Sequence, residues 1–572
     1  MDPPTLNVGG HATLLRPRTG AVRGRVPAPS GPAGSALTRL AVMRRPSRAP
    51  TRTIRGRLAV VVAISAVLVG GCAIGPDPGP DAVTGGGGGG EAAPSSSAPP
   101  PPPRLSAPRT DLNWLDCSDA TTRRYDVPRP SGVRIQCATF ESPIDPDRPE
   151  DDTVTVAATR VTAADTPADA APLVLTAGTD LPSSRVAMLL AAGPGRSVLA
   201  RHPIVAVDRR GIPESSELDC LTRAERTTMA DNGLGFATQS QSDRIARLAR
   251  AATSASDGCT ETLTPHQLDF AVSFAASDLE TLRKRWGVEH LGLIGVGEGS
   301  DVALAYASAY GGRSGRIILD TPTPFGANAR DRANQQATGV QTALRTFTQR
   351  CSAAGDCPLG ADGVATITDV VDKGRSGDLS GISDTQALAG ITTAIAVAPD
   401  GPRGITDVAA MIAAADRGDV AALRRAAQAA EDLRTTDGQL VSRCNDVTGP
   451  VGQNEVPGLI TAWSRQNPIT GANSALGLLR CNGWASTTPV SPPNAFPVAP
   501  LILSGANDPI NGGGGADALR PLLIRAGTEA TTVGWDGIGY SVLARSDCAA
   551  DIVGQYVDTA PLTGPTQRGC PS

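Results

Sequence analysis

One stretch, residues 291–310, decides the fold. It reads LGLIGVGEGSDVALAYASAY, in which a short apolar run leads into Gly295-Val-Gly297-Glu-Gly299 and an alanine-rich segment follows. An apolar strand, a tight turn between glycines and a helix form the context of the G-x-S-x-G nucleophile turn. The turn would raise its central residue above a parallel sheet, and here that residue is Gly297.

Similar short apolar runs on both sides of this stretch predict an α/β sheet. Buried parallel strands are expected at 172–178, 203–208, 316–320, 499–505 and 530–535. Helix-compatible spacing separates them at 184–200, 277–286 and 516–525. Between about 322 and 497 the pattern changes to alanine-rich amphipathic segments such as 408–434. The predicted fold class is therefore α/β, with a mostly parallel sheet flanked by helices and an inserted helical cap.

The N-terminal region has the features of an export signal. A basic flank from Met43 precedes an apolar run, residues 58–69, which is too short to span a membrane and ends in Gly70-Gly71-Cys72. This ending resembles the lipobox of bacterial lipoproteins, in which the cysteine is acylated after cleavage, so Cys72 is the expected lipidated residue. The alternative is an ordinary secretory peptide with an incidental cysteine. Translation from Met1 or from Met43 stays open.

Composition predicts a tether after Cys72 and an acidic body. Residues 72–110 include six consecutive glycines and a run of five prolines, a composition that cannot bury apolar surface. Residues 1–71 hold eleven of the 52 basic residues and one of the 56 acidic ones, which leaves a net formal charge of −14 on the rest of the chain. An acidic body disfavours nucleic acid as a partner.

The ten cysteines after Cys72 predict disulfides. An even number in an exported chain favours five bonds. Sequence alone leaves the connectivity open, but pairing of nearest neighbours closes short loops and gives Cys117–Cys137, Cys220–Cys259, Cys351–Cys357, Cys444–Cys481 and Cys548–Cys570. A metal site is disfavoured, because the chain has no Cys-x-x-Cys and only four histidines. No cofactor is expected.

The order of motifs resembles the secreted tripeptidyl-aminopeptidase-like serine peptidases of actinobacteria, which have the α/β-hydrolase fold. The resemblance covers most of residues 115–572. It rests on 208–220, 278–295, 303–320, the cysteine motifs at 351–360, 444–446 and 481–484, and the tail 556–572. Together with the export signal and the tether, it divides the chain into a leader and lipoprotein signal peptide at 1–71, a lipidated cysteine and tether at 72–110, a first core part at 111–322, a cap at 323–498 and a last core part at 499–572.

Two of the three catalytic positions that the resemblance implies are degenerate. The nucleophile falls on Gly297, which has no side chain. The acid falls on Asp508 and is retained, whereas the histidine falls on Tyr540, whose phenol has too high a pKa to accept a proton near neutrality. The absence of the histidine does not depend on one alignment, because the histidines are residues 11, 202, 266 and 290, and none follows the turn at Gly297.

Three further residues are pocket candidates. Where the family has a glycine-rich turn after the first strand, this chain has Thr176-Ala-Gly-Thr-Asp180, and a carboxylate at Asp180 would oppose an oxyanion. Ser300 is the alternative nucleophile, although it lies a turn into the helix. Glu298 could hold a peptide amine, or could simply stabilise the start of the helix.

Two functions from different classes follow. The first is an exported protein, anchored as a lipoprotein to the outer face of the cytoplasmic membrane or secreted, that keeps the hydrolase scaffold and binds a peptide or envelope ligand, or another protein, without cleaving it. The second is an active serine-type peptidase or hydrolase with a non-standard catalytic arrangement. A purely structural envelope lipoprotein is hard to separate from the first. The sequence leaves the oligomeric state open.

Overall fold

The computed structural model describes residues 101–235, 240–399 and 401–572. The predicted signal peptide, Cys72 and most of the predicted tether lie outside the described residues. The described chain contains a ten-stranded sheet in the order β1-β2-β3-β5-β4-β6-β7-β8-β9-β10. Its strands are β1 (Leu115–Asp116), β2 (Val133–Pro143), β3 (Thr153–Ala163), β4 (Leu173–Thr176), β5 (Ile204–Val207), β6 (Leu291–Val296), β7 (Ser314–Asp320), β8 (Leu501–Asn507), β9 (Thr531–Ile538) and β10 (Gln567–Cys570).

The predicted parallel sheet is confirmed. Strands β4 to β9 lie at the six apolar runs, and every pairing from β5 across to β10 is parallel. The antiparallel strands β1, β2 and β3 extend one edge and were not predicted. Their sequences carry many threonines and charged residues, so they lack the continuous apolar run of a strand that is buried on both faces.

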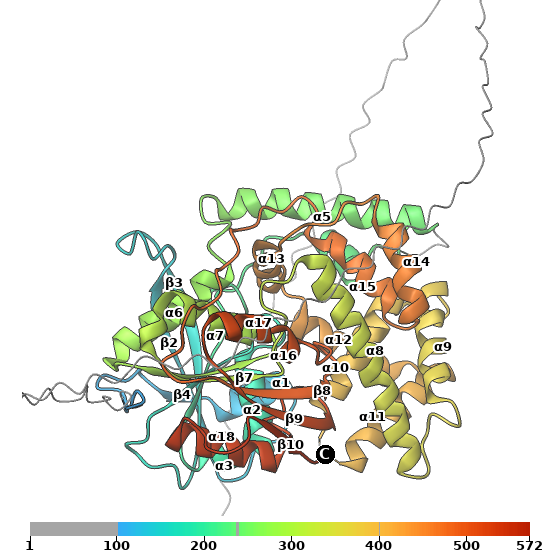
Figure 1. Ribbon diagram of the computed structural model, residues 1–572. Helices are drawn as coiled ribbons and strands as arrows, with labels where there is room; N and C mark the ends of the chain where they lie inside the picture. Colours follow the sequence, from blue (N-terminus) through green and yellow to red (C-terminus); the bar gives the residue numbers. More distant parts are fainter. Residues whose placement is uncertain (1–100, 236–239, 400) are drawn as a thin grey trace, which may run out of the picture. The chain divides into compact units, whose positions relative to one another are not determined.

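Helices cover both faces of the sheet (Figure 1). One face packs against α2 (Ser183–Ala192), α3 (Arg196–Leu199) and α18 (Asp547–Thr559). The other packs against α6 (Val272–Trp286), α7 (Gly299–Tyr310) and α17 (Arg520–Arg525), with the short α16 (Gly515–Ala518) beside them. The central strands have apolar side chains on both faces, and burial of these chains is the main stabilising term of the core.

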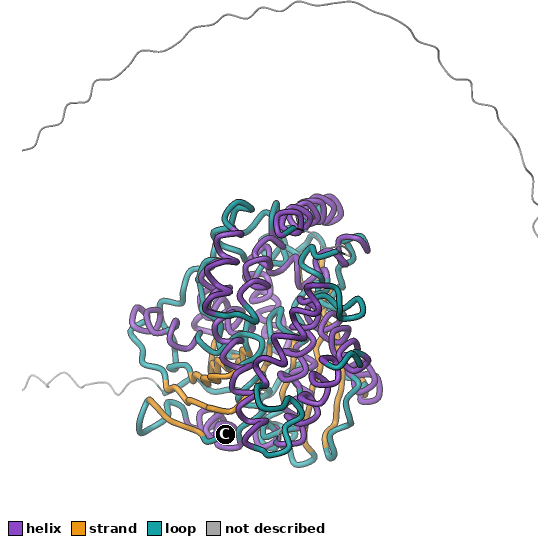
Figure 2. The backbone as a smooth tube through the Cα atoms, turned by 90° about the vertical axis from the view of Figure 1, so that its right-hand side faces the viewer, coloured by secondary structure: helices purple, strands orange, loops and turns teal. Residues whose placement is uncertain are grey.

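A helical cap lies between β7 and β8. It comprises α8 (Ala329–Ala353), α9 (Gly363–Ser376), α10 (Asp384–Val397), α11 (Pro402–Asp416), α12 (Ala421–Arg434), α13 (Asp437–Asp446), α14 (Val456–Gln466), α15 (Gly471–Gly477) and the 3-10 turn η2 (Leu478–Cys481). Figure 2, which views the molecule from the side of the cap, shows purple helices in front of and above the orange strands. Phe347, Ile391 and Ile412 are buried in a core of the cap's own.

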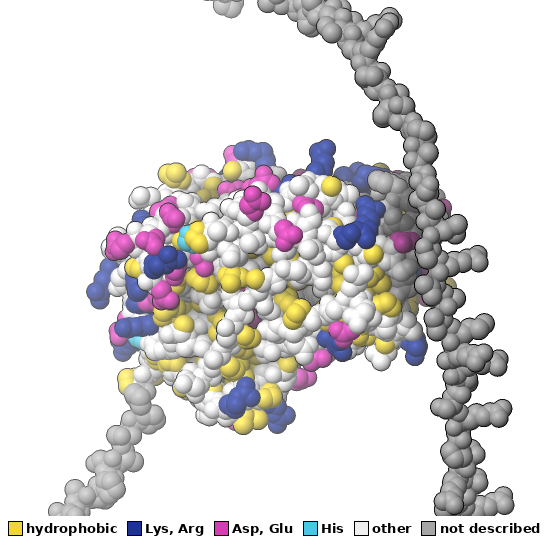
Figure 3. Space-filling view, turned by 90° about the horizontal axis from the view of Figure 1, so that it is seen from above, with side chains coloured by type: hydrophobic (Ala, Val, Ile, Leu, Met, Phe, Trp, Pro, Cys, Tyr) yellow, Lys and Arg dark blue, Asp and Glu magenta, His cyan; other side chains and the backbone are white. Residues whose placement is uncertain are grey.

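Two helices from the first core part join the cap. These are α4 (Arg223–Ala230) and α5 (Gln241–Leu263), and Leu248 of α5 shares a hydrophobic cluster with Val441 of α13 and Leu479 of η2. The remaining helical elements are α1 (Ser118–Tyr125) and η1 (Gly311–Arg313). On the face that α5 crosses, basic and acidic side chains are interspersed among uncharged ones (Figure 3).

The five predicted disulfides are confirmed, with the predicted connectivity. Disulfides persist outside the reducing cytosol, so these bonds indicate an exported protein. In the described part of the chain, no helix is long and apolar enough to cross a membrane. The bond between Cys444 and Cys481 joins α13 to η2, two cap elements that reach the site described next.

Candidate functional site

The nucleophile elbow keeps its backbone geometry. Gly297 lies between β6 and α7 with a φ of +57°, the left-handed conformation that a side chain adopts only at a cost. Its N–H donates to the carbonyl of Asp320 on the neighbouring strand at 2.9 Å. A Cβ on Gly299 would overlap the carbonyl oxygen of Thr176, so the close approach of β4 to the start of α7 requires a glycine there.

The Asp180 side chain occupies the space that a nucleophile would need. A Cβ at residue 297 would overlap Asp180 Oδ2 and Asn511 Nδ2, and it would lie 2.8 Å from Tyr540 Oη. These distances are far shorter than van der Waals contact. The elbow therefore carries no side chain of its own, and a carboxylate from the turn after β4 fills its apex.

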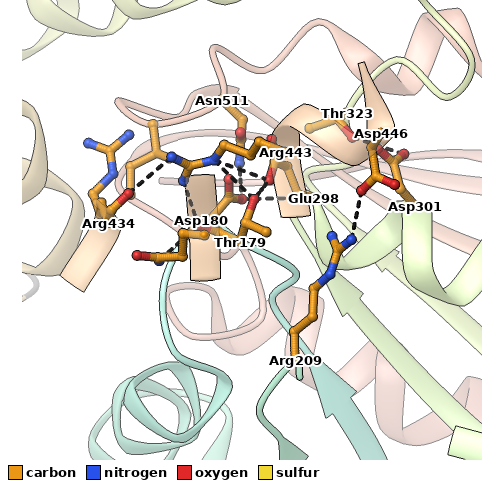
Figure 4. A network of polar contacts seen from close by, with 12 residues as sticks. Thr179, Asp180, Arg209, Glu298, Asp301, Thr323, Arg434, Arg443, Asp446 and Asn511 are labelled. Atoms are coloured by element: carbon orange, nitrogen blue, oxygen red, sulfur yellow. Dashed lines mark hydrogen bonds and ion pairs between the residues drawn. The ribbon is translucent and has the colours of Figure 1, made fainter. Parts of the chain in front are cut away.

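Asp180 Oδ2 is the hydrogen-bond centre of the site. It accepts from Asn511 Nδ2 at 2.6 Å, from the Glu298 backbone N–H at 2.9 Å and from Tyr540 Oη at 3.1 Å. Glu298 is the residue after the elbow centre, and in this fold its N–H is one of the two donors that stabilise an oxyanion. Here that donor is bonded to a protein carboxylate (Figure 4).

The cap holds the turn that carries Asp180. On α13, Arg443 Nη2 and Gln439 Nε2 donate to the Thr179 carbonyl at 2.5 and 3.0 Å. Thr179 Oγ1 in turn bonds to the Glu298 carboxylate, and Figure 4 shows Arg443 among these groups. Since the turn is fixed by core and cap together, Asp180 is placed in the elbow by the tertiary structure.

Asp508, at the retained acid position, directly follows β8 and is fully buried. Its Oδ1 accepts from the backbone N–H groups of Ile510 and Asn511 at 2.7 and 3.2 Å. Its Oδ2 is buried without a hydrogen-bond partner among the described residues. In a Ser-His-Asp triad this carboxylate accepts from an imidazole, so Asp508 keeps the place of the acid and lacks its partner.

Tyr540, at the histidine position, is a buried hydrogen-bond donor. Burial, with the Asp180 carboxylate beside it, raises the pKa of its phenol well above the usual value. Its loop is held by Asp320, whose carboxylate accepts from Ser541 Oγ at 2.6 Å and from the Val542 N–H at 2.8 Å. Tyr540 therefore stays protonated and cannot accept a proton from a nucleophile.

The two buried carboxylates hold protons unusually tightly. Burial raises the pKa of Asp180 to about 7, and the neighbouring Glu298 carboxylate adds to the rise. Burial likewise raises the pKa of Asp508 to about 7, with Asp180 contributing. At pH values below 7 these groups are largely neutral in the folded protein, whereas in the unfolded chain they ionise near pH 4.

This difference predicts a pH-dependent effect of Asp180→Asn. A folded-state pKa above the unfolded one contributes stability that is present below the unfolded pKa and is lost as pH rises through about 7. The amide cannot ionise, so the variant does not lose this stability. Its free energy of unfolding, relative to that of wild type, should rise by about 1 to 4 kcal/mol from pH 5 to pH 8.5. Melting temperatures at both pH values measure the gain. Asp517→Asn, at an exposed carboxylate, should show no such rise. If Asp180→Asn differs from wild type in melting temperature by the same amount at both pH values, the raised pKa of Asp180 is contradicted.

Ser300, considered above as a pocket residue and alternative nucleophile, is fully buried. Its Oγ donates to the Gly295 carbonyl at 3.0 Å, a bond within the turn, and the residue is absent from the cavity lining. The hydroxyl is thus directed back into the elbow. Glu298 does line the cavity, but its carboxylate is engaged by Thr179 and lies 3.9 Å from Arg443 Nε.

A cavity of about 470 Å³ lies between the elbow and the cap. Asp180, Glu298 and Asp301 line it from the core, and arginines of α12, α13 and η2 line it from the cap. The structure thus brings Asp180, Glu298, Asp508 and Tyr540 together around Gly297.

Two residues of the site, Asn511 and Arg443, were not predicted from the sequence. Asn511 lies three residues after Asp508, and this proximity was the one available signal, whereas nothing local marked Arg443.

The sheet order, the elbow after β6, the acid after β8 and the cap before β8 together define an α/β-hydrolase fold. Comparison with known proteins gives the same class. Residues 467–568 match the family described as TAP-like protein. The C-terminal part of the chain is thus similar to the TAP-like α/β-hydrolase family, which confirms the predicted resemblance at that level.

Individual relatives are distant. A stretch of 87 residues is 32% identical to the serine protease Hip1 of Mycobacterium tuberculosis and covers 15% of this chain. The match spans only 17% of the length of that protease. Among solved structures, esterase E22 is 13% identical over 74% of this chain and 100% of its own, with a TM-score of 0.36. The esterase RhEst1 from Rhodococcus sp. ECU1013 is 14% identical over 74% and 98%, with a TM-score of 0.31.

Proposed function

We propose that this chain is an exported, lipid-anchored TAP-like protein that has lost serine-type catalysis and binds a ligand in the cavity beneath its cap. The observation that carries the proposal is the position of Asp180, whose carboxylate fills the apex of the elbow and bonds to the Glu298 N–H. The chain has the α/β-hydrolase scaffold, a cavity beneath the cap and five disulfides. The proposal therefore concerns only the chemistry of the site.

Acyl transfer needs three things that this arrangement does not supply. Gly297 has no side chain to act as a nucleophile, and Tyr540 cannot act as a base. The Glu298 N–H, which would have to stabilise an oxyanion, is already bonded to the Asp180 carboxyl group. Loss of a triad nucleophile or base alone costs several orders of magnitude in rate. A ligand that enters the cavity is therefore expected to be bound and released unchanged.

The alternative is an active hydrolase with a non-standard arrangement. One observation favours it: the pKa of Asp180, at about 7, suits a general base, and the residue lines the cavity. Hydrolysis of a tripeptidyl p-nitroanilide and of p-nitrophenyl butyrate separates the two proposals. We expect no turnover above the uncatalysed rate. Turnover that disappears in Asp180→Asn would support the alternative.

Attachment to the membrane through Cys72 is part of the proposal. The basic flank, the short apolar run and the Gly-Gly-Cys ending support it, as does the export that the disulfides indicate. When produced in an actinobacterial host, the protein should fractionate with membranes, and Cys72→Ser should release it into the soluble fraction. A wild-type protein recovered entirely in the soluble fraction would exclude the anchor.

A further inference from the structure

Three arginines of the cap converge on the cavity. Arg434 ends α12, Arg443 lies on α13 and Arg480 lies in η2, and all three line the cavity wall. The disulfide Cys444–Cys481 joins the residues that directly follow Arg443 and Arg480, with their Cα atoms 5.2 Å apart. Arg443 Nη1 also donates to the Arg434 carbonyl at 3.0 Å. The cluster is therefore fixed by a covalent bond and by the backbone.

Among the described residues, two of these guanidinium groups have hydrogen-bond partners that are all neutral. Arg434 Nη1 donates to Thr393 Oγ1 at 3.1 Å, and Arg480 Nε donates to Asn232 Oδ1 at 2.9 Å. Arg434 Nε is buried without a hydrogen-bond partner within the described chain. No carboxylate among the described residues forms an ion pair with either arginine.

The other arginines of the same cavity show the contrast. Arg209, Arg226 and Arg332 each form an ion pair with an aspartate, at 2.7, 2.8 and 2.9 Å. Their partners are Asp446, Asp437 and Asp301, which also line the cavity. The charge of these pairs is balanced within the protein. The charge of Arg434 and Arg480 is not balanced in this way.

Repulsion between the positive charges of the cluster contributes to lower pKa values of Arg434 and Arg480. Burial and repulsion from Arg443 and Arg434 lower the pKa of Arg480 to about 10, although Asp231 opposes the shift. Burial and Arg443 also lower the pKa of Arg434, although Asp180, Asp508 and Tyr540 oppose this. The cavity acid Glu431 forms no ion pair within the described residues, and its own pKa is raised by burial and Asp432. An added anion would relieve the repulsion in the cluster.

The rest of the wall is largely apolar. Among the described lining residues are Met229, Phe325, Val340, Leu388, Leu440 and Ile510. A volume of about 470 Å³ is within the range of small-molecule sites, about 300 to 1,000 Å³. A wall of this kind favours an apolar body next to the charged cluster.

We propose that the cavity binds a small amphipathic anion, with its carboxylate or phosphate head on Arg434 and Arg480 and its apolar body along the cap wall. This inference rests on the proposed binding function and names the chemical class of its ligand. A guanidinium group presents paired N–H donors that match the oxygens of carboxylates and phosphates. Arg443, already bonded to Thr179, would contribute its charge to the head group.

The test compares four ligands with the same ten-carbon chain, below their critical micelle concentrations. These are decanoate, decyl phosphate, decanol and decyltrimethylammonium, titrated calorimetrically into the purified full-length protein. We expect at least one anion to bind about tenfold or more tightly than decanol, and the cation to bind most weakly, since about 1.4 kcal/mol corresponds to a factor of ten. The order of decanoate and decyl phosphate identifies the preferred head group.

A double variant assigns the head group to the two arginines. In Arg434→Gln/Arg480→Gln the preference for anion over alcohol should fall about tenfold or more, while decanol binding is unchanged. Arg465→Gln, on an exposed position of α14, is the matched control and should keep the full preference. Arg434→Lys/Arg480→Lys, which keeps the charge, should retain part of it.

Several outcomes would overturn the inference. These are equal affinity for decanol and both anions, failure of both anions to bind, and an anion preference that survives the glutamine variant. Equal affinity for decanol and both anions, or an anion preference that survives the glutamine variant, would leave the proposed binding function standing. Hydrolysis of p-nitrophenyl decanoate would instead overturn the proposal that the protein binds without cleaving. If the double variant does not fold, the ranking of the four ligands on wild type decides.

Discussion

Gly297→Ser should destabilise the protein by about 2 to 5 kcal/mol and should create no nucleophile by itself. The backbone φ of +57° costs a non-glycine residue about 1 to 2 kcal/mol, and overpacking in a filled site costs about 1 to 3 kcal/mol more. The new Cβ would overlap Asp180 Oδ2, so the carboxylate must leave its hydrogen bonds. Calorimetry should show a melting temperature lower by several degrees.

Asp180→Gly in the same chain should recover much of this loss. Removing the carboxylate takes away the group that a Cβ at residue 297 would overlap most, although Asn511 Nδ2 stays close. Gly297→Ser should therefore be less destabilising in the Asp180→Gly background than in wild type. Gly312→Ser is the matched control, because a Cβ there meets nothing within 4 Å, and its melting temperature should stay close to wild type. A Gly297→Ser protein as stable as wild type would show that the apex is not filled.

Restoring the triad should require three substitutions. Asp180→Gly removes the carboxylate from the apex and frees the Glu298 N–H, Gly297→Ser supplies the nucleophile, and Tyr540→His supplies the base. The unpartnered Oδ2 of Asp508 is the acceptor that an imidazole at residue 540 would need. We expect this triple variant to react with a fluorophosphonate at the serine introduced at position 297, with labelling at least about a hundredfold faster than in any double variant.

The double variant Gly297→Ser/Tyr540→His is the decisive control. It supplies both missing catalytic groups but leaves Asp180 in the elbow, so it should label slowly or not at all. Equal labelling of the double and triple variants would mean that Asp180 does not block the site. A triple variant that folds but does not label would show that the elbow has lost more than these three groups.

The backbone of the nucleophile elbow could be predicted from the sequence, but the position of the Asp180 side chain at its apex could not. Glycines at 295, 297 and 299 between an apolar run and an alanine-rich segment indicate the elbow through local chemistry alone. The retained Asp508 and the absence of a histidine after residue 290 were equally visible. Asp180 was suspected only of opposing an oxyanion, because its entry into the elbow depends on contacts of Thr179 with the cap.

The same division applies to the fold. The central strands were predictable because burial on both faces gives continuous apolar runs, whereas β2 and β3 have a polar pattern that is typical of many surface segments. The arginine cluster depends on Arg434, Arg443 and Arg480, which are separated in sequence and converge only through helix packing and one disulfide. Local pattern could not reveal that Arg434 and Arg480 have no ion-pair partner among the described residues.

The most direct test of the central claim is covalent labelling of the wild-type protein with a fluorophosphonate, followed by mass spectrometry of its peptides. The elbow holds a carboxylate where a serine would react, so we predict no stoichiometric label on any serine, including Ser300, under conditions in which the triple variant is labelled at residue 297. A single serine labelled in wild type, with hydrolysis of the peptide or ester substrate blocked in parallel, would contradict the account.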